Sequence, residues 1–405
     1  MLTLDMVREA QEALRGIARR TPLDRAPKFG ENVYIKAENL QLTGAFKLRG
    51  AYNKIRSLTP EEAARGVIAC SAGNHAQGIA LSASRLGIKA VICMPAGAPI
   101  SKVEATRGYG AEVVLVPGVY DDAAAEAERL TKEQGYTFAH PFNDPLVIAG
   151  QGTIGLEILE QLPDVEQIVV PIGGGGLIGG IAFAVKQLKP DCRIVGVQAA
   201  GAASMYLSRH AGGPTELRSV STIADGIAVK KPGDLTFALC QQYVDEVVTV
   251  SEDEIASAIL ALMEGQKTVA EGAGAVPVAA VMFGKVDTSE KKTVCVVSGG
   301  QRQAVALLMA TMTPLKFLIL DEHTAALDPK TAEVIMALTD RVIREKHLTA
   351  MMVTHNLRYA VEYGDRILMM NRGRVVLDRA GAEKRATSMD DILTMFNQIS
   401  LETGN

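Results

Sequence analysis

Short apolar segments alternate with longer amphipathic segments through most of the chain. The short segments are rich in β-branched residues and predict buried strands, because strands covered on both faces read as continuous apolar runs. The longer segments, such as NHAQGIALSASRLG, repeat apolar residues at helical spacing. This alternation predicts an α/β protein with largely parallel sheets. The predicted strands cover residues 66–71, 89–95, 111–117, 167–172, 192–198 and 292–298.

The pattern changes after residue 300 but still predicts an α/β arrangement. Residues 315–321 (LKFLILD) predict an unusually apolar strand, and its unpaired edge would invite aggregation or docking of another strand. A helix over 331–346 separates it from a second strand over 348–355. A further helix over 356–364 and two short strands over 366–371 and 373–377 complete the region.

Composition and charge narrow the class of protein. A chain of 405 residues has room for two or three domains. Its 48% hydrophobic and 22% charged residues exclude a disordered chain. A net charge of −4 gives no electrostatic footprint for nucleic acid or anionic lipid. The five cysteines are scattered through apolar runs without a CxxC pair, which favours core residues in a reducing cytoplasm.

No segment of the sequence predicts a signal peptide or a membrane span. Residues 1–20 include acids and predict an amphipathic helix. Residues 168–185 are uncharged over about the length of a membrane span. Four consecutive glycines and a proline interrupt this segment, so it predicts a strand, a glycine loop and a buried helix instead.

Three motifs in the first 300 residues carry chemistry. Residues 36–51 read KAENLQLTGAFKLRGA, residues 71–78 read SAGNHAQG directly after a strand, and residues 173–177 read GGGGL between a strand and a helix. Alone, such a lysine is most often a surface lysine and such glycines are most often a flexible turn. A strand–glycine loop–helix junction also aligns backbone N–H groups toward a phosphate. No GK[ST] follows, so the loop is not a Walker A motif.

In this order the three motifs closely resemble the threonine/serine dehydratases, the pyridoxal-phosphate enzymes of the tryptophan-synthase-β-like fold. The resemblance also covers residues 140–158, 222–237 and 268–276. It implies a two-lobed α/β core of PLP fold type II over residues 1–300, with the cofactor between the lobes. The small lobe would span about 51–144, and the large lobe about 1–50 and 145–300.

The same resemblance implies a role for each matching residue. Lys47 would hold pyridoxal 5'-phosphate covalently, and the freed lysine would take the α-proton of the substrate. Phe46 would pack near the pyridine ring, and Asn74 would hydrogen-bond the phenolic oxygen of the cofactor. The segment from Ser71 to His75 would hold the substrate carboxylate. A hydroxyl at Ser298 would lie beside the pyridine nitrogen and favour β-elimination over transamination. The phosphate would be bound by Gly173, Gly174, Gly175, Gly176 and Leu177.

The implied reaction converts L-threonine and L-serine into a 2-oxo acid and ammonia. Ala72 stands where the related serine racemases usually carry a serine as their second base, which argues against racemisation. The segment 198–206 lacks the carboxylates of the divalent-metal site in the racemase-like members. No metal site and no Mg²⁺ dependence are therefore expected. The resemblance further implies a homodimer or homotetramer acting on a small amino acid.

A second resemblance begins where the first ends. Residues 298–310, 317–328 and 351–355 resemble the C-terminal half of an ABC-transporter ATPase. Because no GxxxxGK[ST] occurs anywhere, this would be a partial P-loop ABC ATPase α/β fragment over about 301–405. ATP and Mg²⁺ would bind only if another chain completed it, and no ATP hydrolysis is expected from this chain alone. The resemblance assigns a signature loop to Ser298, Gly299, Gly300 and Gln301, a Walker B acid to Asp321, the catalytic carboxylate to Glu322, a D-loop position to Asp328 and the switch histidine to His355.

The two resemblances meet at Ser298-Gly299-Gly300, a tripeptide that both families use. The chain therefore resembles a fusion of a dehydratase core with an ATPase fragment. Two alternatives to a working dehydratase remain open. The chain could be a nucleotide-binding transporter subunit, or a chimera impaired because the helix beginning at Gln301 disturbs Ser298.

Overall fold

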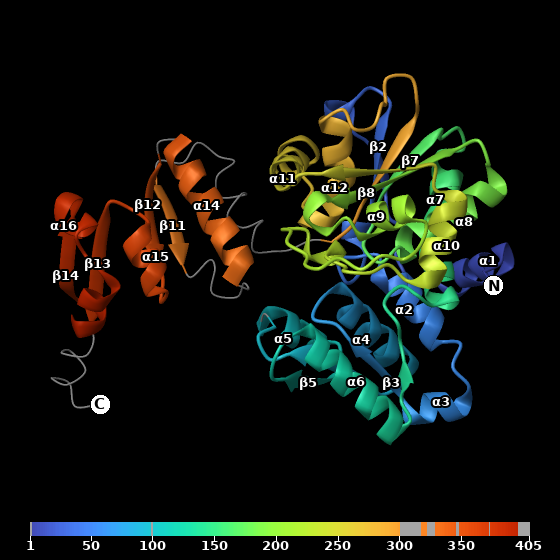
Figure 1. Cartoon of the computed structure of the whole chain (residues 1–405), viewed down its shortest axis with the longest axis horizontal. Coiled ribbons are helices and arrows are strands. Elements are labelled where there is room, and N and C mark those ends of the chain that lie inside the picture. The colour runs from blue at the N-terminus through green and yellow to red at the C-terminus, as the bar shows by residue number, and fades with distance from the viewer. Residues whose placement is uncertain are drawn as a thin grey trace. The chain divides into compact units, whose positions relative to one another are not determined.

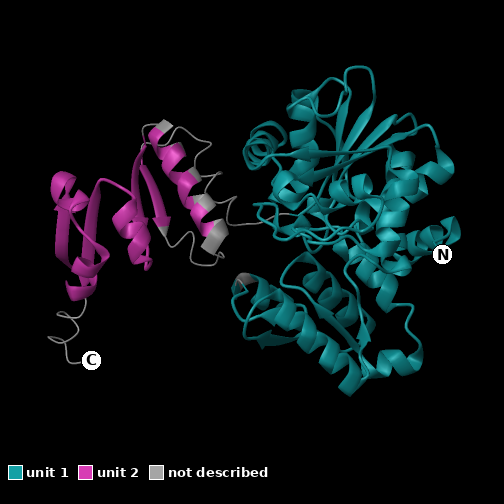
Figure 2. Ribbon diagram, viewed as in Figure 1, with its two compact units in different colours: residues 1–302 teal, residues 303–405 magenta. Residues whose placement is uncertain are grey.

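The computed structural model divides the chain into two compact units, residues 1–302 and 303–405 (Figure 2). The structure describes residues 2–98, 100–299, 317–321, 329–345, 348–371 and 373–395.

The larger sheet of the first unit has six strands in the order β1-β2-β10-β7-β8-β9. Strands β2, β7 and β8 of this sheet are labelled in Figure 1. Only β1 runs antiparallel, against β2, and the other neighbours are parallel. Strands far apart in sequence become neighbours, as β2 pairs with β10 and β10 with β7. The strands are β1 (Leu23–Arg25), β2 (Val33–Ala37), β7 (Gln167–Pro171), β8 (Arg193–Ala199), β9 (Glu246–Val250) and β10 (Thr293–Val297).

Helices cover both faces of this sheet, which explains why its central strands β7 and β10 are buried along their whole length. On one face, α11 (Glu252–Gln266) and α12 (Gly272–Met282) pack against β2 and β8 in one apolar cluster. On the other face, α7 (Pro145–Gln161) and α8 (Gly176–Leu188) pack in a second cluster with β7 and β10. Also in the first unit are α1 (Leu4–Ala13), α9 (Ser204–Ala211), α10 (Asp234–Tyr243) and the short turns η1 (Pro27–Phe29), η2 (Glu38–Leu40), η3 (Ala200–Ala202) and η4 (Asp225–Ile227).

A smaller sheet of the first unit is wholly parallel, with the order β5-β4-β3-β6. The middle strands β3 and β4 are almost entirely buried. Two apolar clusters, one on each face, join this sheet to its helices. The elements are β3 (Val67–Cys70), β4 (Ala90–Pro95), β5 (Glu112–Val116), β6 (Thr137–Phe138), α3 (Pro60–Arg65), α4 (Asn74–Leu86), α5 (Ile100–Gly108) and α6 (Tyr120–Gln134).

Helix α2 (Lys47–Ile55) links the two sheet layers, because it packs against both α4 and α7. The contacts are close enough to require glycine. A Cβ on Gly50 would lie 2.7 Å from the Val147 carbonyl oxygen of α7. A Cβ on Gly78 of α4 would lie 3.1 Å from the Lys47 carbonyl carbon. These two glycines therefore fix the position of the helix that starts with Lys47.

In the second unit, β11 (Phe317–Asp321) pairs in parallel with β12 (Thr349–Val353), and β13 (Arg366–Asn371) pairs antiparallel with β14 (Arg374–Ala380). Phe317 and Ile319 are exposed, whereas Leu318 and Leu320 between them are buried. Helix α14 (Pro329–Glu345) and α15 (Leu357–Glu362) contribute to one small apolar cluster, and α16 (Gly381–Arg385) follows β14. The assignment of this unit to a P-loop ABC fragment stays a prediction.

All the strands predicted from the apolar runs are present among the described residues. The amphipathic helix at the N-terminus is α1, and the segment 168–185 is strand β7, a glycine loop and helix α8, as predicted. None of the helices in the described ranges is long and apolar enough to cross a membrane. All five cysteines are free and buried.

Candidate active site

Lys47 is the first residue of α2, and its side chain lies among groups from several elements. Its Nζ donates a hydrogen bond of 2.8 Å to the Pro141 carbonyl oxygen. It lies 5.3 Å from the centre of the Phe46 ring. Burial lowers the pKa of Lys47 to about 8, and the negative charge of Glu271 opposes this only in part. A lysine with such a pKa has a reactive, unprotonated fraction near neutral pH.

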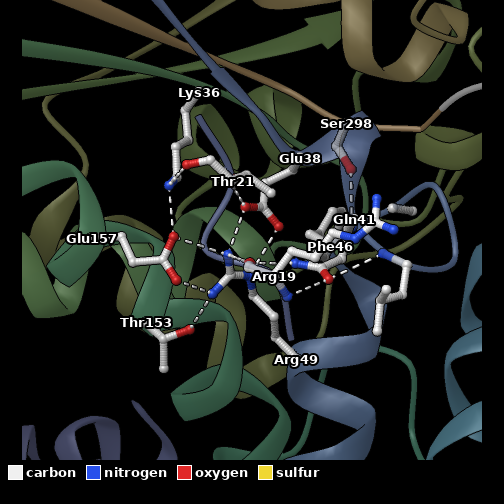
Figure 3. Close-up of polar contacts among 12 residues, drawn as sticks. Arg19, Thr21, Lys36, Glu38, Gln41, Phe46, Arg49, Thr153, Glu157 and Ser298 are labelled. Atoms are coloured by element: carbon white, nitrogen blue, oxygen red, sulfur yellow. Dashed lines mark hydrogen bonds and ion pairs between the residues drawn. The ribbon is translucent and has the colours of Figure 1, made fainter. Parts of the chain in front are cut away.

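A buried ionic network is centred on Arg49, two residues after Lys47 in the sequence (Figure 3). Arg49, the third residue of α2, forms ion pairs with Glu38 of η2 at 2.8 Å and with Glu157 of α7 at 2.6 Å. Lys36 of β2 forms an ion pair with Glu157 at 2.6 Å. The two cations and two anions balance, so the network is neutral. It ties β2, η2, α2 and α7 together where the lysine-bearing helix begins.

The motif SAGNHAQG lies at the carboxyl end of β3, and α4 begins inside it at Asn74. Gly73 is the N-cap of this helix and provides no side-chain cap for its first N–H groups. Ser71 Oγ accepts a hydrogen bond from the Gly73 amide at 3.2 Å, so its hydroxyl hydrogen remains available to donate. Together the helix N-terminus and this hydroxyl are suited to an anionic group.

The imidazole of His75 is committed to the backbone. Its Nε2 lies 2.9 Å from the Ala139 carbonyl oxygen, which can only accept, so Nε2 carries the proton. Nδ1 is buried and has no hydrogen-bond partner among the described residues. Burial, with a smaller contribution from the neighbouring Lys47 charge, lowers the pKa of His75 to about 3. The ring is therefore neutral near pH 7, and Nδ1 can accept but not donate a hydrogen bond.

The glycine loop between β7 and α8 has no room for side chains. Gly175, the N-cap of α8, has φ +94°, a conformation that favours glycine. A Cβ on Gly174 would collide with the Phe142 ring, and one on Gly176 would lie 2.9 Å from the Phe142 Cβ. Thr236 Oγ1 donates to the Gly174 carbonyl oxygen at 2.6 Å and so orients the loop. The amides at the start of α8 lack a side-chain cap and form a cradle suited to a phosphate.

Ser298 lies at the carboxyl end of β10, and its Oγ accepts a hydrogen bond from the Phe46 amide at 3.3 Å. Its backbone packs so tightly on the start of α12 that a Cβ on Gly274 would collide with the Ser298 carbonyl. The strand end and the residue before Lys47 are thus fixed to each other, and the contact appears beside the ionic network in Figure 3. The Ser298 hydroxyl hydrogen is not used in this bond and can be donated.

Glu271 is a site residue that the sequence reasoning missed. Asn74 Nδ2 donates to Glu271 Oε1 at 2.8 Å, which joins the first residue of α4 to the N-cap of α12. Burial raises the pKa of Glu271 to about 7, with a smaller opposing effect of Lys102, of the Asn74 hydrogen bond and of Lys47. A lone acid within the small-residue stretch TVAEGAGAV was the available signal.

The residues of the ABC resemblance fall in different parts of the structure. Ser298 and Gly299 directly follow strand β10 of the first unit. Asp321 ends β11, and His355 is exposed after β12 in the second unit. Gly300, Gln301, Glu322 and Asp328 lie outside the described residues. Over the described ranges, no cluster of three or more His, Cys, Asp or Glu side chains could hold a metal ion.

Comparison with known proteins gives relatives over the first unit. The L-threonine ammonia-lyase of Thermotoga maritima is 54% identical over 304 residues, which are 74% of this chain and 76% of that protein. The processed threonine deaminase isoform 2 of Solanum lycopersicum matches with TM-score 0.70 and 42% identity, covering 74% of this chain and 89% of that one. Maize serine racemase matches with TM-score 0.71 and 37% identity, covering 74% and 93%.

The family model described as pyridoxal-phosphate dependent enzyme matches residues 14–300. That range contains Lys47, the glycine loop and Ser298, and the loop has the shape and the uncapped amides that a phosphate needs. The α/β core of PLP fold type II expected from the sequence is thereby confirmed. This chain belongs to the family of pyridoxal-phosphate dependent enzymes.

Proposed function

We propose that this chain is an L-threonine ammonia-lyase that converts L-threonine, and also L-serine, into a 2-oxo acid and ammonia. The 54% identity with the Thermotoga maritima L-threonine ammonia-lyase carries the proposal. The likeness to the Solanum lycopersicum threonine deaminase and the surroundings of Lys47 support it.

Pyridoxal phosphate, when bound, supplies an aldehyde that joins amines covalently and a ring that withdraws electrons from the substrate Cα. Lys47 is the residue proposed to hold it. Its lowered pKa of about 8 suits two tasks, the attack of the amine on a carbonyl carbon and the acceptance of the Cα proton at Nζ. The Pro141 carbonyl, 2.8 Å from Nζ, keeps the amine in place.

The loop Gly173–Gly176 with Leu177 is proposed to bind the phosphate through the first amides of α8. The tight contact with Phe142 excludes side chains at Gly174 and Gly176. The dipole of α8, a helix from Gly176 to Leu188, adds a favourable interaction with a negative group.

Ser298 is proposed to lie beside the ring nitrogen, with Phe46 next to the ring. The Phe46 amide already donates to Ser298 Oγ, so the hydroxyl is oriented with its hydrogen free. A hydroxyl is uncharged and donates a hydrogen bond to an unprotonated nitrogen. Such a partner moderates electron withdrawal by the ring, which favours elimination of the β-hydroxyl over transamination.

The segment from Ser71 to His75 is proposed to bind the substrate carboxylate. Ser71 offers a hydroxyl donor, and the uncapped start of α4 offers backbone amides. The neutral ring of His75 holds Ala139 and adds no charge. The carboxylate is therefore bound by neutral donors, and the Lys47 amine remains the basic group beside the substrate.

The likeness to maize serine racemase raises racemisation as a second activity. Inversion at Cα needs proton acceptors on both faces of the substrate, and Ala72 offers none at its position. Elimination is therefore the proposed reaction. Chiral analysis of serine after incubation with the enzyme tests this, and rapid formation of D-serine would contradict it.

The test of the main proposal is release of 2-oxobutanoate from L-threonine by the purified chain with pyridoxal phosphate. Lys47→Ala should abolish release, whereas Lys132→Ala, at an exposed position of α6, should leave it unchanged. Borohydride treatment followed by peptide mapping should place the cofactor on Lys47. Full activity in Lys47→Ala would refute the assignment.

We also propose that the enzyme works in the cytoplasm as a homodimer or homotetramer, as the resemblance implies. The free, buried cysteines are consistent with a reducing compartment. Light scattering after size-exclusion chromatography would give the mass of the assembly. A monomer that retains full activity would contradict the oligomer.

For the second unit we propose a partial ABC ATPase fragment without nucleotide hydrolysis of its own. The sequence contains no GxxxxGK[ST], so it lacks the loop and lysine that bind the β- and γ-phosphates. ATP turnover by the purified chain should equal that of Glu322→Gln. Turnover that disappears in Glu322→Gln would refute this proposal.

A further inference from the structure

Glu271 is the acidic group nearest to the residues proposed to bind the cofactor, and no step described so far uses it. It lies at the N-cap of α12, and its amide donates to the Gly299 carbonyl oxygen at 2.8 Å. Two glycines enclose its carboxylate. A Cβ on Gly226 would lie 2.9 Å from Oε1, and a Cβ on Gly299, which has φ +83°, would collide with the same oxygen. The backbone from three segments is therefore shaped to admit this side chain.

The contact with Asn74 fixes which way its amide faces. A carboxylate only accepts hydrogen bonds, so the group that lies 2.8 Å from Oε1 must be the Asn74 Nδ2. The reversed amide would place Oδ1 against a carboxylate oxygen and be repelled. Nδ2 has two N–H bonds, and only one is used by Glu271. The second N–H is left for another acceptor.

We propose that Glu271 is a positioning residue that locks the Asn74 amide so that its second N–H donates to the phenolic oxygen of pyridoxal phosphate. This inference rests on the proposed function, in which Asn74 contacts the cofactor. An ionised phenolic oxygen needs a donor, and a free asparagine could present either its oxygen or its nitrogen. Glu271 removes that choice without touching the cofactor itself.

The charged neighbours are compatible with this role. Lys47 on α2 and Lys102 on α5 favour the ionised carboxyl, whereas Asp225 on η4 and burial disfavour it. The pKa of Glu271, about 7, means that the lock is fully set above neutral pH and weakens as the carboxyl is protonated. From α4, the group that contacts the Glu271 carboxylate is the uncharged amide of Asn74.

The test is a double-mutant cycle of Glu271→Gln and Asn74→Ala, read from the visible spectrum of the holoenzyme at pH 8. Loss of the donor should lower the ratio of long- to short-wavelength absorbance about tenfold, the value of a hydrogen bond to a charged group. Asn74→Ala should show this change, Glu271→Gln most of it, and the double variant no further change. Glu252→Gln is the matched control, because that acid binds the Ile223 amide and should leave the spectrum unchanged.

An unchanged spectrum in Glu271→Gln, or an equal change in the Asn74→Ala background, would overturn the proposal. A second measurement needs no cofactor. In the apo protein labelled with ¹⁵N-asparagine, the Asn74 side-chain signal should be shifted by the carboxylate and move in Glu271→Gln, but not in Glu252→Gln. If the wild type binds no cofactor, the proposed function fails, and this shift alone decides whether the lock exists; its absence overturns the proposal.

Discussion

Replacing Arg49 by methionine should strongly destabilise the first unit, because it removes the cation that two buried carboxylates share. The side chain of Arg49 is 1% exposed, that of Glu38 0% and that of Glu157 10%. The five N–H groups of Arg49 make six hydrogen-bond contacts, one N–H of Nη2 being shared: two each to Glu38 and Glu157 and one each to Thr153 and to the Arg19 carbonyl. Methionine fills a similar volume but makes none of them.

The expected cost follows from the charge left behind. With Lys36 and Arg49 facing Glu38 and Glu157, the network is neutral, and Arg49→Met leaves it at −1. Removing one partner of a buried ion pair typically costs about 3–5 kcal/mol. Domains of this kind are stable by about 5–15 kcal/mol, so the variant should be marginal or unfolded. Loss of hydrogen bonds that left no unpaired buried charge would cost much less.

The pH dependence of stability distinguishes the cost of an unpaired buried charge from the cost of the lost hydrogen bonds alone. Burial alone would raise the pKa of Glu38, but the charge and hydrogen bonds of Arg49, together with the charge of Lys36 and the hydrogen bond from Thr21, outweigh it and leave that pKa below its usual value. In the wild type this group therefore contributes stability above its unfolded pKa, and the contribution is lost as the pH falls through the lower folded pKa. In Arg49→Met the carboxyl is buried without that cation, its pKa rises, and protonation relieves the cost. The stability deficit should therefore shrink on acidification from pH 8 to pH 5.

Urea unfolding followed by far-ultraviolet circular dichroism, at pH 8 and at pH 5, measures the loss of stability in Arg49→Met and its change with pH. Arg85→Met is the matched control, because this exposed arginine of α4 makes one hydrogen bond to the Ile17 carbonyl. It should change stability by less than about 0.5 kcal/mol. Thr153→Val gives a milder perturbation of the same network if Arg49→Met cannot be purified. A loss below about 1 kcal/mol in Arg49→Met, or a deficit that grows on acidification, would refute the reasoning.

Three other consequences can be measured directly. Gly174→Ala should weaken binding of pyridoxal phosphate about tenfold or more, since its Cβ would collide with the Phe142 ring. Gly179→Ala, in the helix α8 that follows the loop, has ordinary contacts at 3.4 Å and should bind normally; equal affinities of the two variants in an absorbance titration would contradict this. Gln151→Met should raise the free energy of unfolding by about 1 kcal/mol, because both polar atoms of this buried side chain lack hydrogen-bond partners within the described structure, and a loss in urea unfolding would show that they are satisfied. In the apo protein, arylation of Lys47 should increase with pH through a midpoint near 8; a midpoint above 10 would show an ordinary solvated lysine.

The strands that could be predicted from the sequence were those whose buried residues are nearly all apolar. Strand β7 reads QIVVP and β3 reads VIAC, and every residue of each is buried. Their glycine or small-residue loops were equally clear, since few side chains fit at such junctions. Lys47, Asn74 and the glycine loop before α8 were thus placed on their correct elements from the sequence alone.

Strand β2 was missed because charge hides it. It reads VYIKA and ends beside Glu38, which from sequence suggests a solvent-exposed turn. In the structure Lys36 is fully buried, and its partner Glu157 lies 121 residues away. A buried charge is tolerated only when paired, and the pairing is a property of the fold. Sequence periodicity therefore cannot separate such a strand from a surface loop.

The same argument explains why Glu271 was missed while Asn74 was found. Asn74 stands at the start of a helix after a strand, a position with a local signature. Glu271 is distinguished only by what lies around it, namely Asn74, which is 197 residues away, and the glycines that leave room for its carboxylate. A group that binds the cofactor directly has a motif, because the cofactor constrains its neighbours in sequence. A group that acts through another residue is constrained only in space, and the tertiary structure is needed to find it.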